Sequence, residues 1–388
     1  GSHTLGEWEN LKAQYNFREA KLGPEFAKDK LKEFRQLIDA GLSFVVVSMP
    51  RVGVSYFLKY LAMQKFAHFV HVDLYSLPTL NQHEFYRMFL RDLKGNPDGK
   101  SDEQVFIDTK EILKNLAAKY DKIVVVFSRF DQLKNDFDAN FLSNLQALTT
   151  IQSTKIVLIF TSIKPLYDIA PEAVTGGNLT FYSKHLYFKP FPSNDLKNLL
   201  KLNPESASST QTLDKLIELS GGHNQLLRLL LASPKQNLLL DRFVKMQMKE
   251  FIDYLDYHQR KQIQKLALGK KIEEPDEYLL DVGMVKKIDS KYQLFTPLLA
   301  EYIKTNMPVK LPVKESKLFK LLRQNMGRTV TKDEIFANVW DPPAGGPEGA
   351  TDWALDALIY RLRKHPFMKA NNYIIESHKK VGYTLIQT

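Results

Sequence analysis

Between about residues 42 and 190, short runs of β-branched and apolar residues alternate with stretches of amphipathic helical spacing. The runs are 44–48, 69–74, 122–127 and 155–161. The last two are almost continuously apolar, which is typical of strands buried on both faces in a parallel sheet. The segments between and after them, 56–64, 81–93, 102–119 and 140–149, are long enough for right-handed helical crossovers. This alternation predicts a doubly wound α/β domain.

The turn after the first predicted strand has the outline of a phosphate-binding loop. Such a loop reads Gly-x-x-x-x-Gly-Lys-Ser/Thr: backbone N–H groups wrap the phosphates, the lysine neutralises them and the hydroxyl holds Mg²⁺. In this chain Gly53 is the second glycine and Ser55 is the hydroxyl. Ser48 stands at the first glycine, and Val54 stands at the lysine. The sequence therefore predicts the loop without its cation.

Part of an anion site remains in this loop. Backbone amides, Gly53, Ser55 and the N-terminus of the helix that contains Tyr56 are groups that bind anions, and Arg51 can restore a positive charge. We name Arg51, Gly53, Ser55 and Tyr56 as a vestigial nucleotide site for ATP or ADP. The competing interpretation is a purely structural domain with no cofactor, and the missing lysine favours it.

The order of segments over residues 22–307 resembles the AAA+/STAND group of P-loop NTPases. In that family the third strand ends in an Asp that binds Mg²⁺ and an acidic residue that activates water. Here the strand runs into Ser128 and Arg129, which can do neither. Asp131 lies three residues past the strand end and is interpreted as a turn or cap residue rather than a catalytic one. Losing both the lysine and the Asp removes most of the electrostatic stabilisation of phosphoryl transfer. We expect a P-loop NTPase-like fold and no meaningful hydrolysis, so no catalytic residue is assigned.

Two further segments carry the same resemblance. Thr161-Ser162 ends the fourth strand, where the family places a polar sensor of the γ-phosphate. Gly221-Gly222-His223-Asn224 resembles the Gly-Gly-His-Pro start of a STAND lid helix, with Asn224 in place of Pro. We expect His223 to begin that helix rather than to act chemically. Arg228 could reach a phosphate across the cleft, but a position on a solvated helix face is the favoured interpretation.

Residues 317–388 repeat an order of helices followed by a hairpin. Helical segments open at 318–322, 331–340 and 352–364, with Thr331 and Glu334 spaced as a capping box, and two strands follow within 373–386. The run Asp356-x-x-Ile359-x-Arg361-Leu362-Arg363-Lys364 and the run Gly382-Tyr383-x-Leu385 resemble the OmpR/PhoB-type winged helix of bacterial response regulators. The chain departs from that family in the longer Pro/Gly-rich loop 341–350 and at the wing, where Lys379-Lys380 stands in for a more Arg/Gly-rich tip. A DNA-binding winged helix is the expectation.

Charge supports a polyanionic partner for this segment. The chain has a net charge of +10, and residues 308–388, with 13 Lys and Arg against 8 Asp and Glu, carry half of it. Four apolar residues supply the buried stripe of the third helix: Leu355, Leu358, Ile359 and Leu362. The candidates for DNA contact are Tyr360, Arg361, Arg363, Lys364, Lys379 and Lys380. The alternatives are an ion pair within the module for Arg361 and a solvated hairpin tip for Lys379 and Lys380.

The remaining segments complete the predicted domain order. Residues 279–295 are expected to form two short strands around a polar turn, as the wing of a first winged helix. The predicted division is 1–3, an expression scar; 4–191, a degenerate AAA+/STAND P-loop NTPase-like domain; 192–236, a helical lid; 237–307, a winged-helix-like domain; 308–316, a linker; and 317–388, the OmpR-type winged helix.

Composition excludes several classes of protein. The chain has no cysteine, so disulfides, thiolate metal sites and cysteine nucleophiles are excluded, and no metal site is assigned. No run approaches the ~18 apolar residues of a membrane span, and we expect a cytoplasmic protein without a membrane partner. The oligomeric state is not assigned.

Three functions remain in competition on the sequence alone. The favoured one is a DNA-binding regulator or DNA-bound scaffold, whose inactive AAA+/STAND-like core receives a protein partner or senses a ligand. The second is an active or nucleotide-gated ATPase that uses Arg51 and Asp131 as displaced catalytic groups. The third is a protein–protein interaction scaffold whose winged helices do not bind DNA.

Overall fold

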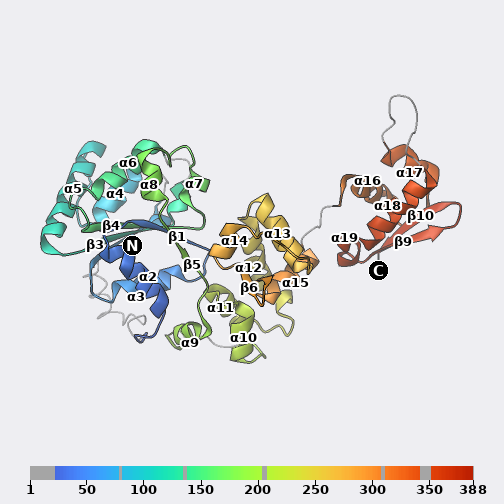
Figure 1. Ribbon diagram of the computed structural model, residues 1–388, viewed down its shortest axis with the longest axis horizontal. Coiled ribbons are helices and arrows are strands. Elements are labelled where there is room, and N and C mark those ends of the chain that lie inside the picture. The colour runs from blue at the N-terminus through green and yellow to red at the C-terminus, as the bar shows by residue number, and fades with distance from the viewer. Residues whose placement is uncertain are drawn as a thin grey trace. The chain divides into compact units, whose positions relative to one another are not determined.

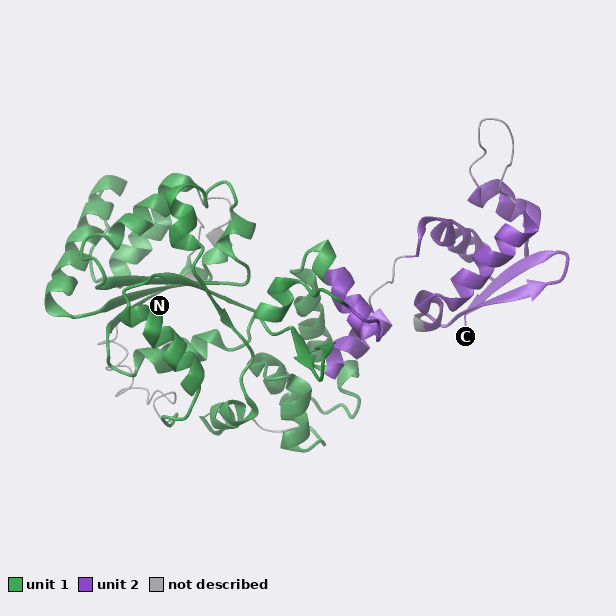
Figure 2. Cartoon of the chain, viewed as in Figure 1, with its two compact units in different colours: residues 1–259, 273–296 green, residues 260–272, 297–388 purple. Residues whose placement is uncertain are grey.

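The computed structural model describes residues 22–77, 81–133, 138–202, 208–306, 311–340 and 351–387 (Figure 1). The chain divides into two compact units (Figure 2), which are described separately. The first comprises residues 1–259 and 273–296, and the second comprises 260–272 and 297–388. The domain boundaries drawn from the sequence stay predictions. No helix in the described ranges combines the length and the apolar character that crossing a membrane requires.

A five-stranded parallel sheet forms the centre of the first unit. Its strands are β1 (Phe44–Ser48), β2 (His68–Asp73), β3 (Ile123–Ser128), β4 (Ile156–Ser162) and β5 (His185–Phe188). They lie in the order β2-β3-β4-β1-β5, and every pairing is parallel. This confirms the doubly wound α/β prediction and the positions of the four strands. The fifth strand, β5, was not predicted; it has four residues, and only alternate ones are buried.

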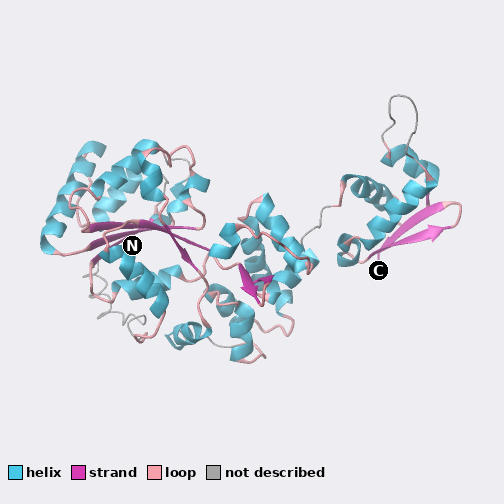
Figure 3. Ribbon diagram, in the orientation of Figure 1, coloured by secondary structure: helices cyan, strands magenta, loops and turns pink. Residues whose placement is uncertain are grey.

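Helices cover both faces of this sheet (Figure 3). In Figure 1, α2 (Lys28–Asp39) and α3 (Val54–Ala62) lie on one face, and α4 (Gln82–Asp92), α5 (Asp102–Lys119), α6 (Ala139–Leu148) and α8 (Gly177–Tyr182) lie on the other; the short α7 (Leu166–Ile169) precedes α8. Three of them begin at side-chain caps, Asn81, Ser101 and Asp138. Buried aromatic rings fill the space under α4 and α6, among them Phe85, Phe127, Phe141 and Phe160.

Short helices continue the chain after β5. They are α9 (Ser193–Leu202), α10 (Leu213–Ser220), α11 (Asn224–Ala232), α12 (Arg242–Asp253), α13 (Tyr257–Ala267) and α14 (Glu277–Asp281). A hairpin of β6 (Val285–Ile288) and β7 (Lys291–Leu294) follows, and then α15 (Pro297–Asn306).

One expectation for this region is wrong. Residues 279–281 were expected to begin a strand but belong to α14. Asp276 caps that helix by accepting a hydrogen bond from Leu279 N at 3.2 Å, and Tyr278 and Leu279 are buried. The polar turn between the strands of the hairpin is present, with Asp289 and Ser290 both at positive φ.

The C-terminal module of the second unit combines helices with a three-stranded sheet. Its elements are α16 (Val313–Gln324), β8 (Val330–Thr331), α17 (Lys332–Val339), α18 (Asp352–Lys364), α19 (Pro366–Ala370), β9 (Tyr373–His378) and β10 (Gly382–Gln387). The sheet has the order β8-β10-β9 and is antiparallel. The capping box of Thr331 and Glu334 is confirmed. The loop 341–350 lies outside the described residues.

Close packing explains the glycine of the predicted wing motif. A Cβ at Gly382 would lie 1.9 Å from the carbonyl oxygen of Val330, so only glycine lets β10 pair with β8 at this point. The predicted apolar stripe of α18 is also confirmed, because Leu355, Leu358, Ile359 and Leu362 are buried in the core of the module. The short elements β8 and α19 were not predicted.

Candidate functional site

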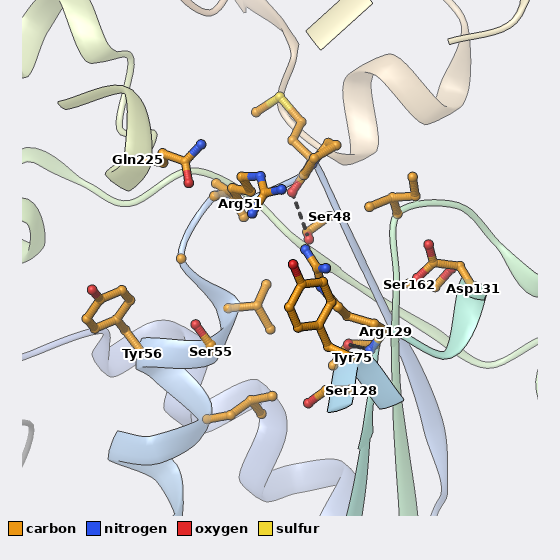
Figure 4. Close-up of a pocket in the computed structure, with 18 of the residues that line it drawn as sticks. Ser48, Arg51, Ser55, Tyr56, Tyr75, Ser128, Arg129, Asp131, Ser162 and Gln225 are labelled. Atoms are coloured by element: carbon orange, nitrogen blue, oxygen red, sulfur yellow. Dashed lines mark hydrogen bonds between the residues drawn. The ribbon is translucent and has the colours of Figure 1, made fainter. Parts of the chain in front are cut away.

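The loop between β1 and α3 opens onto a cavity of about 670 Å³ in the first unit (Figure 4). The cavity lies at the carboxyl ends of β1, β3 and β4, where open α/β sheets bind their ligands. All four residues of the predicted vestigial nucleotide site line it: Arg51, Gly53, Ser55 and Tyr56. The structure therefore brings these residues together at one pocket.

The loop has the backbone geometry of a tight turn into a helix. Arg51 has a φ of 59° and Gly53 a φ of 123°, and Gly53 is the residue before α3 begins. A Cβ at Gly53 would lie 2.5 Å from the ring of Phe191. The glycine is thus required both by its conformation and by the ring packed against it. Val54, at the position of the lysine, is the first residue of α3.

His223 fixes this loop to the segment that begins α11. Its Nδ1 accepts a hydrogen bond from Leu226 N at 3.1 Å, so Nε2 carries the proton and donates to the carbonyl oxygen of Pro50 at 2.8 Å. Asn224 N also donates to the carbonyl oxygen of Val52 at 3.2 Å. Complete burial lowers the pKa of His223 to about 4. His223 begins the helix, as predicted, and it also holds the loop.

A carboxylate from α12 meets the arginine of the loop. Arg51 Nε donates to Glu250 Oε1 at 3.0 Å, and both side chains line the cavity. Gln247 donates to the other oxygen of Glu250 at 3.2 Å and accepts from Gln225 at 2.6 Å. Arg51 was considered as a replacement for the positive charge that Val54 lacks. Instead, its charge is balanced by Glu250, which the sequence analysis did not name.

The end of β3 differs from a magnesium site. Ser128 Oγ is hydrogen-bonded to Nε2 of His71 on β2. The guanidinium of Arg129 lies over the ring of Tyr75, 4.5 Å from its centroid, and both residues line the cavity. Asp131 lines the cavity too, in the short helix Phe130–Leu133. Within the described residues, no group of His, Asp and Glu is arranged to hold a metal ion.

The hydroxyls at the end of β4 take part in local structure. Thr161 Oγ1 accepts a hydrogen bond from Arg129 N at 2.8 Å. Ser162 is buried, and its Oγ donates to the carbonyl oxygen of Lys164 and accepts from Lys164 N. These bonds fix the backbone after β3 and β4. Both hydroxyls therefore have hydrogen-bond partners within the protein, and no phosphate is needed to explain either residue.

The cavity has no excess of positive charge. Three arginines line it, Arg51, Arg129 and Arg228, and three carboxylates line it as well, Asp73, Asp131 and Glu250. The guanidinium of Arg228 lies 5.2 Å from the ring centroid of Tyr56. An intact phosphate site would need a surplus of cations to neutralise a nucleoside triphosphate. The described lining residues do not supply one.

In the second unit, α18 presents the residues proposed for DNA contact. Tyr360 and Lys364 are exposed, with the Lys364 ammonium 5.9 Å from the Tyr360 ring centroid. Arg361 Nε donates to Glu315 Oε1 on α16 at 2.8 Å, so the ion pair weighed in the sequence analysis is present. Arg363 donates from Nε and Nη2 to the carbonyl oxygen of Ile375 on β9, at 3.1 and 2.7 Å. Both arginines therefore hold the module together.

The tip of the β9–β10 hairpin carries the other two candidates. Lys379 and Lys380 are exposed in the turn, where Lys380 has a φ of 65°. The structure also exposes Trp353 at the start of α18, with 80% of its surface accessible. Trp353 was not among the residues predicted from the sequence. Its position outside the buried stripe of the helix was the signal that could have identified it.

The ion pair of Arg361 predicts a stability effect. Glu315 has only 8% of its side chain exposed, so Arg361→Ala leaves a buried carboxylate without its partner. We expect the free energy of unfolding of the module to fall by about 1–3 kcal/mol. Urea unfolding followed by tryptophan fluorescence measures it, because Trp340 and Trp353 both lie in this module. Lys364→Ala is the control, and an equal effect of both changes would contradict the structural role of the pair.

Comparison with known proteins supports this description of the C-terminal module. Residues 306–385 match the family model described as "Transcriptional regulatory protein, C terminal". This confirms the OmpR/PhoB-type winged helix predicted at the C-terminus. No curated protein matches the chain.

Solved structures with a likeness to this chain include three archaeal proteins. A Walker-type ATPase of Pyrococcus abyssi is 16% identical, with 73% of this chain and 95% of that chain covered and a TM-score of 0.46. The Orc1 protein of Aeropyrum pernix, solved in complex with DNA, is 12% identical, with 92% and 87% covered and a TM-score of 0.39. Cdc6p of Pyrobaculum aerophilum is 14% identical, with 73% and 95% covered and a TM-score of 0.39. The P-loop NTPase-like fold assigned here follows from the strand order and from the loop after β1.

Proposed function

We propose that this protein is a DNA-binding regulator whose C-terminal winged helix binds duplex DNA and whose core does not hydrolyse nucleotide. The observation that carries the proposal is the exposed surface of the C-terminal module. Tyr360 and Lys364 on α18 and two lysines at the hairpin tip are exposed there, on a segment that matches a transcription-regulator domain. A helix for the major groove and a basic wing for the phosphates are the two parts that such binding needs.

The core serves this function as a scaffold rather than as an enzyme. Val54 replaces the phosphate-binding lysine, Ser128 replaces the magnesium ligand, and Glu250 puts a carboxylate against Arg51. A triphosphate entering the cavity would meet that carboxylate, and like charges at such distances repel. In this proposal the core binds a protein partner and holds no nucleotide itself.

Removing the two lysines of the hairpin tip tests the DNA interface. We expect Lys379→Gln with Lys380→Gln to weaken binding to any duplex by about tenfold, and to reduce the slope of log affinity against log salt by about 1.8. The measurement is fluorescence anisotropy with a labelled duplex at several salt concentrations. The matched control is Lys235→Gln with Lys245→Gln, which removes the same charge from exposed sites in the first unit. Equal effects of the two double variants would contradict a specific role for the tip.

A further inference from the structure

The exposed face of α18 has an apolar centre. Trp353, Ala357, Tyr360 and Lys364 are spaced four, three and four residues apart, so they follow one line along the helix. This line lies opposite the buried residues Leu355, Leu358 and Leu362. Trp353 and Tyr360 are 80% and 63% exposed, and Trp353 is more exposed than any other large apolar side chain among the described residues.

Three charged side chains of α18, those of Arg361, Arg363 and Asp356, lie at the edges of this face and are bound to other parts of the module. Arg361 is paired with Glu315 on one side. On the other side, Arg363 is bonded to the carbonyl oxygen of Ile375, and Asp356 Oδ1 accepts from the hydroxyl of Tyr383 at 2.8 Å. Arginine and aspartate are among the side chains that read guanine and cytosine in the major groove. Here these residues support the helix and leave its centre to aromatic and methyl groups.

Apolar side chains recognise one feature of the major groove. Each thymine presents a C5-methyl group there, and apolar groups such as alanine and aromatic side chains contact it. The N-terminal residues of a recognition helix are the ones that meet the base edges, and Trp353 is the second residue of α18. The ammonium of Lys364, one turn beyond Tyr360, is available to a phosphate at the other end of the line.

We propose that α18 reads thymine methyl groups through Trp353, Ala357 and Tyr360, so that the chain selects duplexes with neighbouring A·T pairs. This inference rests on the proposed function, because it assumes that the C-terminal module binds duplex DNA. It adds the class of target sequence and makes Trp353 and Tyr360 the residues that determine specificity.

Replacing thymine by uracil tests this directly, because the two bases differ only in that methyl group. The full chain is first used to select duplexes from a random library, and the selected duplex is then remade with deoxyuridine at one thymine after another. We expect neighbouring thymines to be selected, and an affinity loss of about fourfold for each contacted methyl group removed. For each of the variants Trp353→Ala and Tyr360→Ala, deoxyuridine replacement of the thymine that the truncated side chain contacts should cost less affinity than it does in the unaltered protein.

Two controls separate the outcomes. Met326→Ala truncates another exposed apolar side chain of the same module and should leave the thymine dependence unchanged, and Tyr360→Phe should retain it. Salt-dependent binding that does not distinguish thymine from uracil at any position would overturn this inference and leave the proposed function in place. Absence of binding to every duplex would overturn both.

Discussion

Purified protein with ATP and Mg²⁺ is expected to release phosphate roughly 10³-fold or more slowly than an intact P-loop ATPase. The physical reason is the loss of two independent charges at the reacting phosphate. Val54 stands at the lysine, and the serine at the magnesium position, Ser128, is hydrogen-bonded to His71. The measurement is phosphate release under conditions in which an intact P-loop ATPase is assayed in parallel. Calorimetry with ATP, ADP and GTP, with and without Mg²⁺, follows binding separately.

The alternative enzyme hypothesis predicts a different pattern. If Arg51 and Asp131 were displaced catalytic groups, phosphate release would be measurable, and Arg51→Ala or Asp131→Ala would abolish it. Glu250→Gln is the informative partner variant, because it removes the charge that balances Arg51 but keeps the shape of the side chain. Micromolar nucleotide binding by the unaltered protein, without turnover, would contradict the scaffold and make the core a nucleotide-gated switch.

Acid is expected to destabilise the first unit through His223. Burial lowers the pKa of this imidazole from an ordinary value of 6.5 to about 4. Below about pH 6.5 the imidazole is protonated in the unfolded chain but stays neutral in the folded chain until the pH approaches 4. The stability that the neutral His223 contributes is therefore complete above about pH 6.5 and is lost as the pH falls toward 4. The loss amounts to about 3 kcal/mol in the free energy of unfolding.

A variant without the imidazole isolates this effect. His223→Gln keeps an N–H group that can donate to the carbonyl oxygen of Pro50 but does not titrate. Urea unfolding of both proteins at several pH values between 7 and 4 gives the comparison. The imidazoles of His68 and His185, whose pKa values are also lowered by desolvation, remain in both proteins, so their contributions cancel. Identical pH dependence of the two proteins would contradict the assignment to His223.

Local patterns of the sequence predicted most of the fold. The runs of β-branched residues at β1, β3 and β4 are buried along nearly their whole length, so the residue types alone indicate them. The capping box of Thr331 and Glu334 depends only on two residues three positions apart, so it could be predicted from the sequence equally well. By contrast, β5 has four residues, and its place at the edge of the sheet beside β1 depends on tertiary pairing.

The candidate site was predictable only in part. The loop motif placed Arg51, Gly53, Ser55 and Tyr56 at one pocket, because a phosphate loop is a continuous segment. The partner of Arg51, Glu250, is 199 residues away in the chain, and no periodicity connects the two. The pairing of Arg361 with Glu315, 46 residues apart, could be raised only as an alternative for the same reason. Long-range pairing of charges depends on the folded arrangement rather than on local spacing.

Titration of a labelled duplex with the full chain at increasing salt concentration tests the central claim most directly. About three phosphate contacts, from Lys364, Lys379 and Lys380, predict a slope of log affinity against log salt near −2.7, or about a fortyfold loss between about 50 and 200 mM salt. Binding with such a slope supports a DNA-binding winged helix. Absent or salt-insensitive binding would contradict the account and favour a protein whose winged helices contact only other proteins.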